Sequence, residues 1–287
     1  MTPRTFAKYT PLGRLALIPF RWAWALSYPL RQAWRVTRWA FQSKEYYNHT
    51  YELTPLNRDY LASFVAIVSG HAEADIDRYV RELEEDSPLR HQLQELTRRS
   101  RDRHNCDVDP HYGRRAGWYA ILRATRPRVV VETGVDRGLG TAVMAAAMKR
   151  NADEGFPGLV YATDIIPECG HLLAEPYKQH CRILLGDSVE TLKKFAEPVD
   201  IFLHDSDHRP EYEWAEFLAV EPKLHAGSIV MSDNSQQSSK LREFARRLGR
   251  QFLFFQDQPK DHWWPGDGIG AAFAPGVKTV FQDRRSG

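Results

Sequence analysis

From residue 116 onward, short apolar runs alternate with amphipathic segments, and this alternation restricts the fold of the chain more than any other feature. Runs of this kind, mostly apolar and rich in β-branched residues, are typical of strands buried on both faces. Six of them stand out: RVVVETGV, LVYATDI, CRILLGD, VDIFLHD, GSIVMSD and QFLFFQD. Strands that alternate with helices indicate a parallel sheet covered by helices on both sides. The sequence therefore predicts an α/β fold with a doubly wound, mostly parallel sheet.

The segments between these runs have helical spacing of apolar residues. They include residues 116–125, 141–151 and 168–180, the last of which reads ECGHLLAEPYKQH. Each is predicted to be a helix that covers one face of the sheet.

Composition excludes several classes of protein. Of the 287 residues, 43% are hydrophobic and 26% are charged, and the net charge is only +2, so neither a membrane-spanning protein nor a nucleic-acid partner is expected. Three cysteines, Cys106, Cys169 and Cys181, lack paired C-x-x-C spacing. Such usage is typical of a reducing compartment, and the expected location is the cytoplasm.

Residues 1–44 differ from the rest of the chain, with eight Lys or Arg, no acidic residue and four of the eight tryptophans. A helical wheel of residues 30–42 places Arg31, Arg35, Arg38 and Gln42 on one stripe. One interpretation is a helix lying peripherally on the inner face of an anionic membrane. The alternatives are a helix packed on the main domain or on a second subunit in a homodimer, and a transit peptide, which the tryptophans disfavour.

Residues 45–111 are predicted to form a charged helical region, and residues 112–287 the cofactor-binding domain. Ligands of such sheets bind at the carboxyl ends of the strands. Glu132 ends the first strand, and Gly134 and Gly138 follow it in a turn where the backbone can approach a ligand closely.

Acidic and hydroxyl side chains follow the next two strands. Asp164 can accept the hydroxyl protons of a ribose. Asp187 and Ser188 follow the third strand, where they are expected near an adenine. A nicotinamide dinucleotide is an alternative ligand, but the turn lacks the G-x-G-x-x-G spacing that cradles a pyrophosphate.

The ordered series VVVETGVDRGLGTA, YATDI, LLGDS, VDIFLHDSDH and LHAGSIVMSDN, within residues 112–275, resembles class I S-adenosylmethionine-dependent O-methyltransferases. It is most similar to the metal-dependent branch with catechol, caffeoyl-CoA and bacterial sugar methyltransferases, although the glycine turn has the E-x-G-V-x-x-G form. The resemblance implies a seven-stranded Rossmann-like sheet and S-adenosylmethionine as cofactor. The implied cofactor-binding residues are Glu132, Gly134, Gly138, Thr141, Asp164, Asp187 and Ser188.

The resemblance also implies that the fourth and fifth strands are neighbours, so that Asp205 meets Asp233 and Asn234. Oxygen ligands of this kind suit Mg²⁺ or another divalent cation, which would orient the acceptor hydroxyl. The alternative is that both aspartates cap the helices that follow them.

His208 stands where catechol methyltransferases have a lysine base and related sugar enzymes have a histidine, so it is the predicted general base. Strand alternation places His204 in the packed interior, and Asp207 is expected to bind metal or face water. A zinc site at the two histidines lacks further ligands.

These features predict an O-methyltransferase that acts on a hydroxyl of a sugar, glycolipid or other natural product. Catechol or phenol methylation is the alternative reaction. A non-catalytic nucleotide-binding scaffold of the same fold is the alternative outside enzymes.

Overall fold

The computed structural model describes residues 10–46, 49–276 and 278–282, and the chain divides into two compact units. The helical unit comprises residues 1–44 and 261–264; the sheet unit comprises residues 45–260 and 265–287. The first nine residues of the predicted basic segment and the last five of the predicted cofactor domain lie outside the described residues.

The sheet unit is built on seven strands in the order β3-β2-β1-β4-β5-β7-β6. The strands are β1 (Val129–Thr133), β2 (Leu159–Asp164), β3 (Cys181–Leu185), β4 (Val199–His204), β5 (Leu224–Asp233), β6 (Gln251–Gln256) and β7 (Gly268–Phe273). All neighbouring pairs among β1 to β5 are parallel, whereas β7 is antiparallel to both β5 and β6. The predicted mostly parallel, seven-stranded sheet is confirmed.

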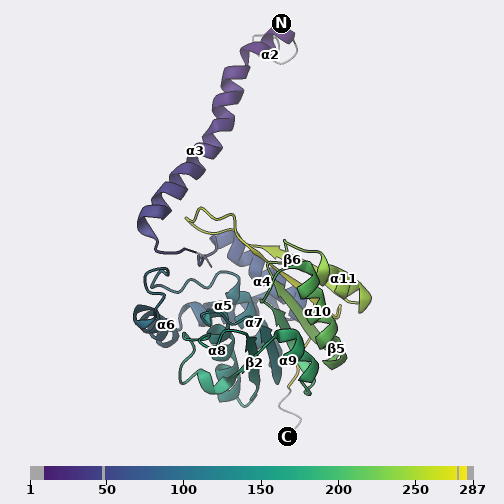
Figure 1. The fold of residues 1–287 in the computed structure, drawn as a ribbon. Helices are drawn as coiled ribbons and strands as arrows, with labels where there is room; N and C mark the ends of the chain where they lie inside the picture. Colours follow the sequence, from purple (N-terminus) through teal and green to yellow (C-terminus); the bar gives the residue numbers. More distant parts are fainter. Residues whose placement is uncertain (1–9, 47–48, 277, 283–287) are drawn as a thin grey trace. The chain divides into compact units, whose positions relative to one another are not determined.

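Helices cover both faces of this sheet, as a doubly wound fold requires (Figure 1). One face carries α4 (Pro55–Ser69), α5 (Glu73–Glu84), α7 (Arg115–Thr125) and α8 (Leu139–Asp153), with α6 (Ser87–Arg99) packed at the margin of the same apolar core. The other face carries α9 (Ser188–Lys194), α10 (Pro210–Val220) and α11 (Lys240–Arg247) around a second core. Short 3₁₀ turns, η1 (Lys178–His180) and η2 (Glu221–Lys223), precede β3 and β5.

The region 45–111 shares its core with the sheet. A Cβ on Gly117 of α7 would lie 2.8 Å from Leu61 of α4, so these two helices are in close contact. Arg123 of α7 is 2% exposed and donates to Glu82 of α5 at 2.6 Å and to Glu154 just after α8. An ion pair and apolar packing therefore attach this region to the cofactor domain.

Two parts of the sheet unit differ from the predictions. Residues 168–180 form turns and only the 3₁₀ turn η1 instead of the predicted helix. Pro176 lacks an amide hydrogen and disfavours helical backbone at the preceding residue, and Gly170 adopts a left-handed φ of 72°. Strand β7, GIGAAF, was not among the predicted runs, because glycine and alanine have low strand propensity. A Cβ on Gly270 would lie 2.4 Å from Ser235 Oγ, so close packing explains the glycine.

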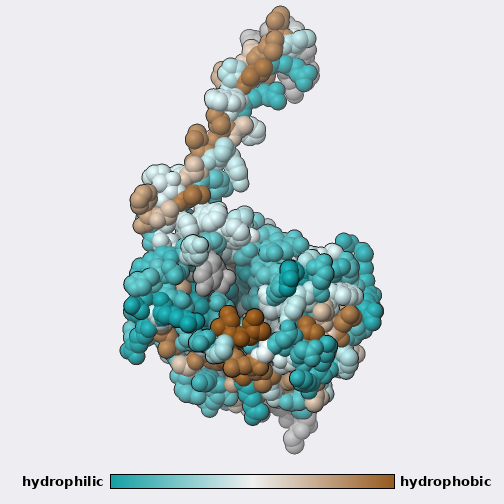
Figure 2. Space-filling model, in the orientation of Figure 1, coloured by the Kyte–Doolittle hydropathy of each residue, from teal (hydrophilic) through white to brown (hydrophobic). Residues whose placement is uncertain are grey.

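The helical unit contains α2 (Pro11–Ala16) and α3 (Ile18–Gln42). None of the side chains of α3 is buried, and Figure 2 shows apolar groups alternating with polar groups along it. Within the unit, the Trp39 ring centroid lies 5.3 Å from that of Trp263. Over the ranges that the structure describes, no helix has the length and apolar character needed to cross a membrane.

The ends of β1 and β4 approach each other so closely that only glycine fits between them. Gly134 has a φ of 88°, and a Cβ at this position would lie 2.0 Å from the carbonyl oxygen of Asp205. The backbone amide of Asp205 in turn donates to the carbonyl of Thr133 at 2.9 Å. Gly134 therefore controls where the tip of β4 lies.

We predict that Gly134→Ala destabilises the sheet unit much more than Gly155→Ala. Gly155 has a similar φ of 91°, but no heavy atom lies within 4 Å of the point that a Cβ would occupy. Gly155→Ala should therefore lose only the free energy of placing a non-glycine residue in left-handed backbone, about 1–2 kcal/mol. The clash at Gly134 should bring the total to at least about 3 kcal/mol. Urea unfolding of both variants measures the difference, and equal losses would contradict the close approach.

Candidate active site at the carboxyl ends of the strands

A cleft of about 650 Å³ lies at the carboxyl ends of β1 to β5. It is lined by all but one of the predicted site residues: Glu132, Gly134, Gly138, Asp164, Asp187, Ser188, Asp205, His208, Asp233 and Asn234. The exception, Thr141, is buried behind the cleft. A larger hollow of about 910 Å³ at the amino ends of β1, β2 and β4 contains none of these residues.

Glu132 ends β1 as an almost fully buried carboxyl group, 1% exposed. Thr141 donates a hydrogen bond to its Oε2 at 2.6 Å, so Thr141 supports Glu132 from behind. Burial raises the pKa of Glu132 to about 8, because an ionised carboxylate is poorly solvated there. A cationic ligand beside it would favour the ionised form.

The other predicted cofactor residues also organise the backbone around them. Asp164 accepts hydrogen bonds from the amides of Val135 and Asp136, both at 2.9 Å, and so holds the glycine turn after β1. Asp187 caps α9 by accepting from the amide of Glu190, which is the main reason why its pKa lies below the usual range. Tyr212 donates to the same carboxylate at 2.8 Å.

A second, buried carboxylate behind the strand ends was not predicted. Glu216 of α10 is fully buried and accepts hydrogen bonds from side chains at three strand ends: Thr133, the last residue of β1, Ser188 after β3, and Ser206 after β4. His204 Nδ1 lies 2.6 Å from Glu216 Oε2, which confirms the predicted packed position of His204. The available signal was the spacing of Glu213 and Glu216, which are three residues apart and so share one face of the helix.

The ends of β4 and β5 bring the predicted acceptor-side residues together. His204 pairs with Ser232 across the two strands, so Asp205 and Asp233 follow at neighbouring positions. His208 Nε2 lies 3.9 Å from Asp205 Oδ1 and accepts a hydrogen bond from Asn234 Nδ2 at 3.0 Å. Burial lowers the pKa of His208, which favours its neutral form.

Two oxygen groups remain open to a ligand here. No side chain in the described ranges donates a hydrogen bond to the Asp205 carboxylate, and the buried Oδ1 of Asn234 has no partner there either. Burial and the charge of Asp233 raise the pKa of Asp205 well above its usual range. By contrast, Asp207 pairs with Arg209, with 2.8 Å between Oδ2 and Nε, and no hydrogen bond joins it to His208 within the described residues.

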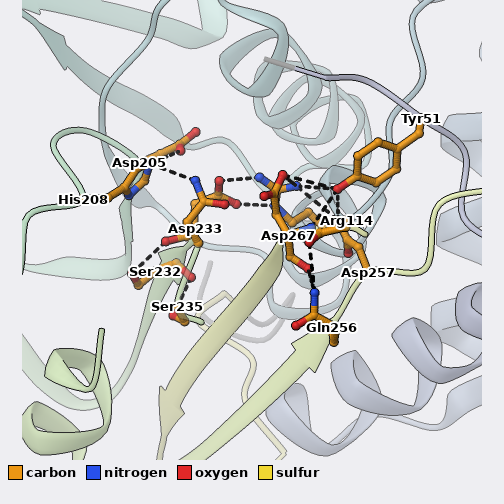
Figure 3. Close-up of polar contacts among 12 residues, drawn as sticks. Tyr51, Arg114, Asp205, His208, Ser232, Asp233, Ser235, Gln256, Asp257 and Asp267 are labelled. Atoms are coloured by element: carbon orange, nitrogen blue, oxygen red, sulfur yellow. Dashed lines mark hydrogen bonds and ion pairs between the residues drawn. The ribbon is translucent and has the colours of Figure 1, made fainter. Parts of the chain in front are cut away.

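Asp233 is held by an arginine that the sequence analysis did not identify. Arg114, which precedes α7, donates from Nε to Oδ1 and from Nη2 to Oδ2 of Asp233. Its remaining nitrogen, Nη1, lies 3.1 Å from Asp257, 3.2 Å from Asp267 and 3.3 Å from the Tyr51 hydroxyl (Figure 3). Burial alone would raise the pKa of Asp233, but the Arg114 charge outweighs it and holds the pKa below its usual range.

The predicted magnesium site does not fit the side chains in this arrangement. Asp205, His208 and Asp233 each offer a ligand atom within 4.8 Å of the others, which is the spacing of a metal site. However, both oxygens of Asp233 already accept from Arg114. A divalent ion on Asp233 would lie beside a buried guanidinium charge, where repulsion is poorly screened.

Comparisons with known proteins agree with this fold. Residues 131–235 match the family model described as "Methyltransferase domain". No curated protein sequence matches the chain. Among solved structures, the O-methyltransferase TomG from Streptomyces achromogenes, which is involved in tomaymycin synthesis and was solved with S-adenosylmethionine, has 16% identity and a TM-score of 0.50. The match covers 67% of this chain and 91% of TomG.

A second structure, the Podospora anserina methyltransferase PaMTH1 bound to S-adenosylhomocysteine, is 13% identical with a TM-score of 0.47. That match covers 69% of this chain and 94% of PaMTH1. The family match lies on the strands whose ends form the cleft, from β1 to just beyond β5. The sheet unit therefore has the Rossmann-like fold of class I methyltransferases, and residues 131–235 are similar to a methyltransferase domain.

Proposed function

We propose that this chain transfers the methyl group of S-adenosylmethionine to a hydroxyl of a small molecule. The observation that carries the proposal is the cleft at the strand ends, which joins the residues expected to bind the cofactor to the Asp205–His208–Asn234 group. The TomG structure, an O-methyltransferase solved with this cofactor, supports the same reading of the fold.

The cofactor end of the cleft suits a ligand that carries positive charge. Glu132, Asp164 and Asp187 line it at the ends of β1, β2 and β3. The raised pKa of Glu132 reflects the poor solvation of a negative charge there, which Thr141 and Arg115 offset only in part. The ammonium and sulfonium groups of S-adenosylmethionine would supply that compensation.

At the other end, three groups can receive an acceptor hydroxyl. Asp205 and Asn234 Oδ1 are open hydrogen-bond acceptors, and His208 is favoured in the neutral form that can take a proton. In the reaction the hydroxyl oxygen forms a bond to the methyl carbon while the carbon–sulfur bond breaks, and the hydroxyl proton passes to His208 Nε2, which gives up its hydrogen bond from Asn234. The chain's task is to align the two reactants and accept this proton.

A sugar-like acceptor fits this end better than a catechol or phenol. The acceptor side is lined by Asp205, Asp207, His208, Arg209 and Asn234, which are all polar. Tyr212 is the one phenylalanine, tyrosine or tryptophan among the described lining residues, and its hydroxyl is bound to Asp187 at the cofactor end. A polyol can satisfy these groups with its hydroxyls, whereas a flat aromatic ring would leave them unpaired.

We also propose that α3 lies on an anionic membrane surface, which would suit a glycolipid acceptor. Large apolar side chains along it are exposed, including Trp22, Trp34 and Phe41, with exposed fractions of 68%, 68% and 89%. The helix also carries four arginines and no acidic residue. This combination is typical of helices that lie in the headgroup region of a bilayer.

We predict that His208→Gln lowers kcat at least about a hundredfold while the affinity for S-adenosylhomocysteine stays unchanged, because only the proton acceptor is lost. Transfer of a labelled methyl group to a panel of sugars, glycolipids and catechols measures turnover. His91→Gln, on the exposed side of α6, is the matched control and should behave as wild type. Full turnover in the His208 variant would rule out this base.

For the membrane proposal, we predict that the chain sediments with phosphatidylglycerol vesicles and much less with phosphatidylcholine vesicles. Exchanging Trp34 and Phe41 for serine should release it, since their burial provides apolar free energy. Ile67→Ser removes a comparably exposed residue of α4 and should leave sedimentation unchanged. Equal binding by both variants would contradict a role for α3.

A further inference from the structure

The charge cluster around Arg114 joins parts of the chain that are remote in sequence. Arg114 precedes α7, Asp233 ends β5, Asp257 follows β6 and Asp267 precedes β7. Only Asp233 lies within the matched methyltransferase segment, residues 131–235. The cation beside Asp233 is therefore supplied by sequence outside that segment.

All three nitrogens of the Arg114 guanidinium face carboxylates in this cluster. Nε and Nη2 bind the two oxygens of Asp233 in a bidentate pair, and Nη1 faces Asp257, Asp267 and the Tyr51 hydroxyl. Arg114 is 4% exposed. A planar guanidinium in this geometry both neutralises a carboxylate and orients it, which a flexible ammonium does less well.

These contacts give different partners to the two aspartates that the sequence analysis placed in one metal site. Asp233 accepts from Arg114 on both oxygens, whereas Asp205 accepts from no side chain in the described parts of the chain. Asp205 and Asn234 Oδ1 are thus left for a neutral hydrogen-bond donor such as an acceptor hydroxyl.

We propose that Arg114 takes the place of a divalent cation in this site, so that the chain positions its acceptor and transfers methyl groups without a bound metal. Arg114 is a positioning residue: it holds Asp233, which precedes Asn234, the residue bound to His208. The statement about turnover rests on the proposed methyltransferase function, but the statement about ion binding does not.

The experiment is a titration of the full-length chain with MgCl₂ and MnCl₂ after treatment with chelator, followed by calorimetry and by melting temperature. Wild type is expected to bind neither ion and to melt at the same temperature with and without them.

Arg114→Met removes the guanidinium at similar volume and frees Asp233. The melting temperature of this variant is expected to rise on addition of either ion. Arg242→Met is the control, because Arg242 is exposed on α11 and does not line the cleft; it should not gain this response.

Turnover in chelator gives a second readout. Wild type should lose less than about twofold, against the loss of a hundredfold or more expected if an essential ion were removed. Arg114→Lys keeps the positive charge but cannot donate two parallel hydrogen bonds to Asp233. Its turnover should stay independent of metal, with a lower kcat. This variant replaces Arg114→Met if Arg114→Met does not fold.

Stoichiometric binding of Mg²⁺ or Mn²⁺ to wild type, abolished by Asp205→Asn, would overturn the proposal whatever the turnover. Loss of turnover in chelator that either ion restores would overturn it as well. Failure of S-adenosylhomocysteine to bind in the same samples would instead count against the methyltransferase function and leave the ion titration to decide the role of Arg114.

Discussion

The buried pair of Arg114 and Asp233 determines how the acceptor side of the cleft is arranged. Removing one partner of such a pair leaves an uncompensated charge in a poorly solvated position, which typically costs about 3–5 kcal/mol. The pair connects the entry to α7 with the end of β5, and Arg114 also binds groups beside β6 and β7. The N-terminal helices and the antiparallel end of the sheet therefore meet at the site, and the methyltransferase segment is not sufficient to build it.

The strand ends are supported from the opposite face of the sheet by a second polar layer. Glu216 accepts hydrogen bonds from residues after β1, β3 and β4, and Glu213 accepts from Ser232 of β5 at 2.7 Å. Both come from α10, which follows the loop that carries Asp205 and His208. A single helix thus orients the strand tips, while the side chains facing the cleft remain open to ligands.

Much of the fold could be predicted because its signal is local. Apolar runs such as VVVET and VDIFLH are strands in any environment that buries both faces, and the carboxyl ends of parallel strands necessarily meet at one edge. The meeting of Asp205 with Asp233 and Asn234 also required β4 and β5 to be neighbours, which the resemblance to class I methyltransferases implied. By contrast, β7 and the segment 168–180 depend on close packing of glycines and on Pro176, which periodicity does not register.

The role of Arg114 could not be predicted for a different reason. An arginine before a helix is ordinarily a solvated residue, and its partner Asp233 is 119 positions away. Only the tertiary structure shows that the carboxylate expected to bind magnesium is already neutralised. The prediction of a metal ion relied on residue type and position, and neither of these registers that both oxygens of Asp233 accept from Arg114.

The central claim is that the cleft at the strand ends is a site for S-adenosylmethionine. Calorimetric titration of the full-length chain with S-adenosylhomocysteine in metal-free buffer, with NAD as the competing nucleotide, tests it most directly. The account predicts one binding site per chain for S-adenosylhomocysteine and no binding of NAD. Heat from NAD together with none from S-adenosylhomocysteine would contradict it.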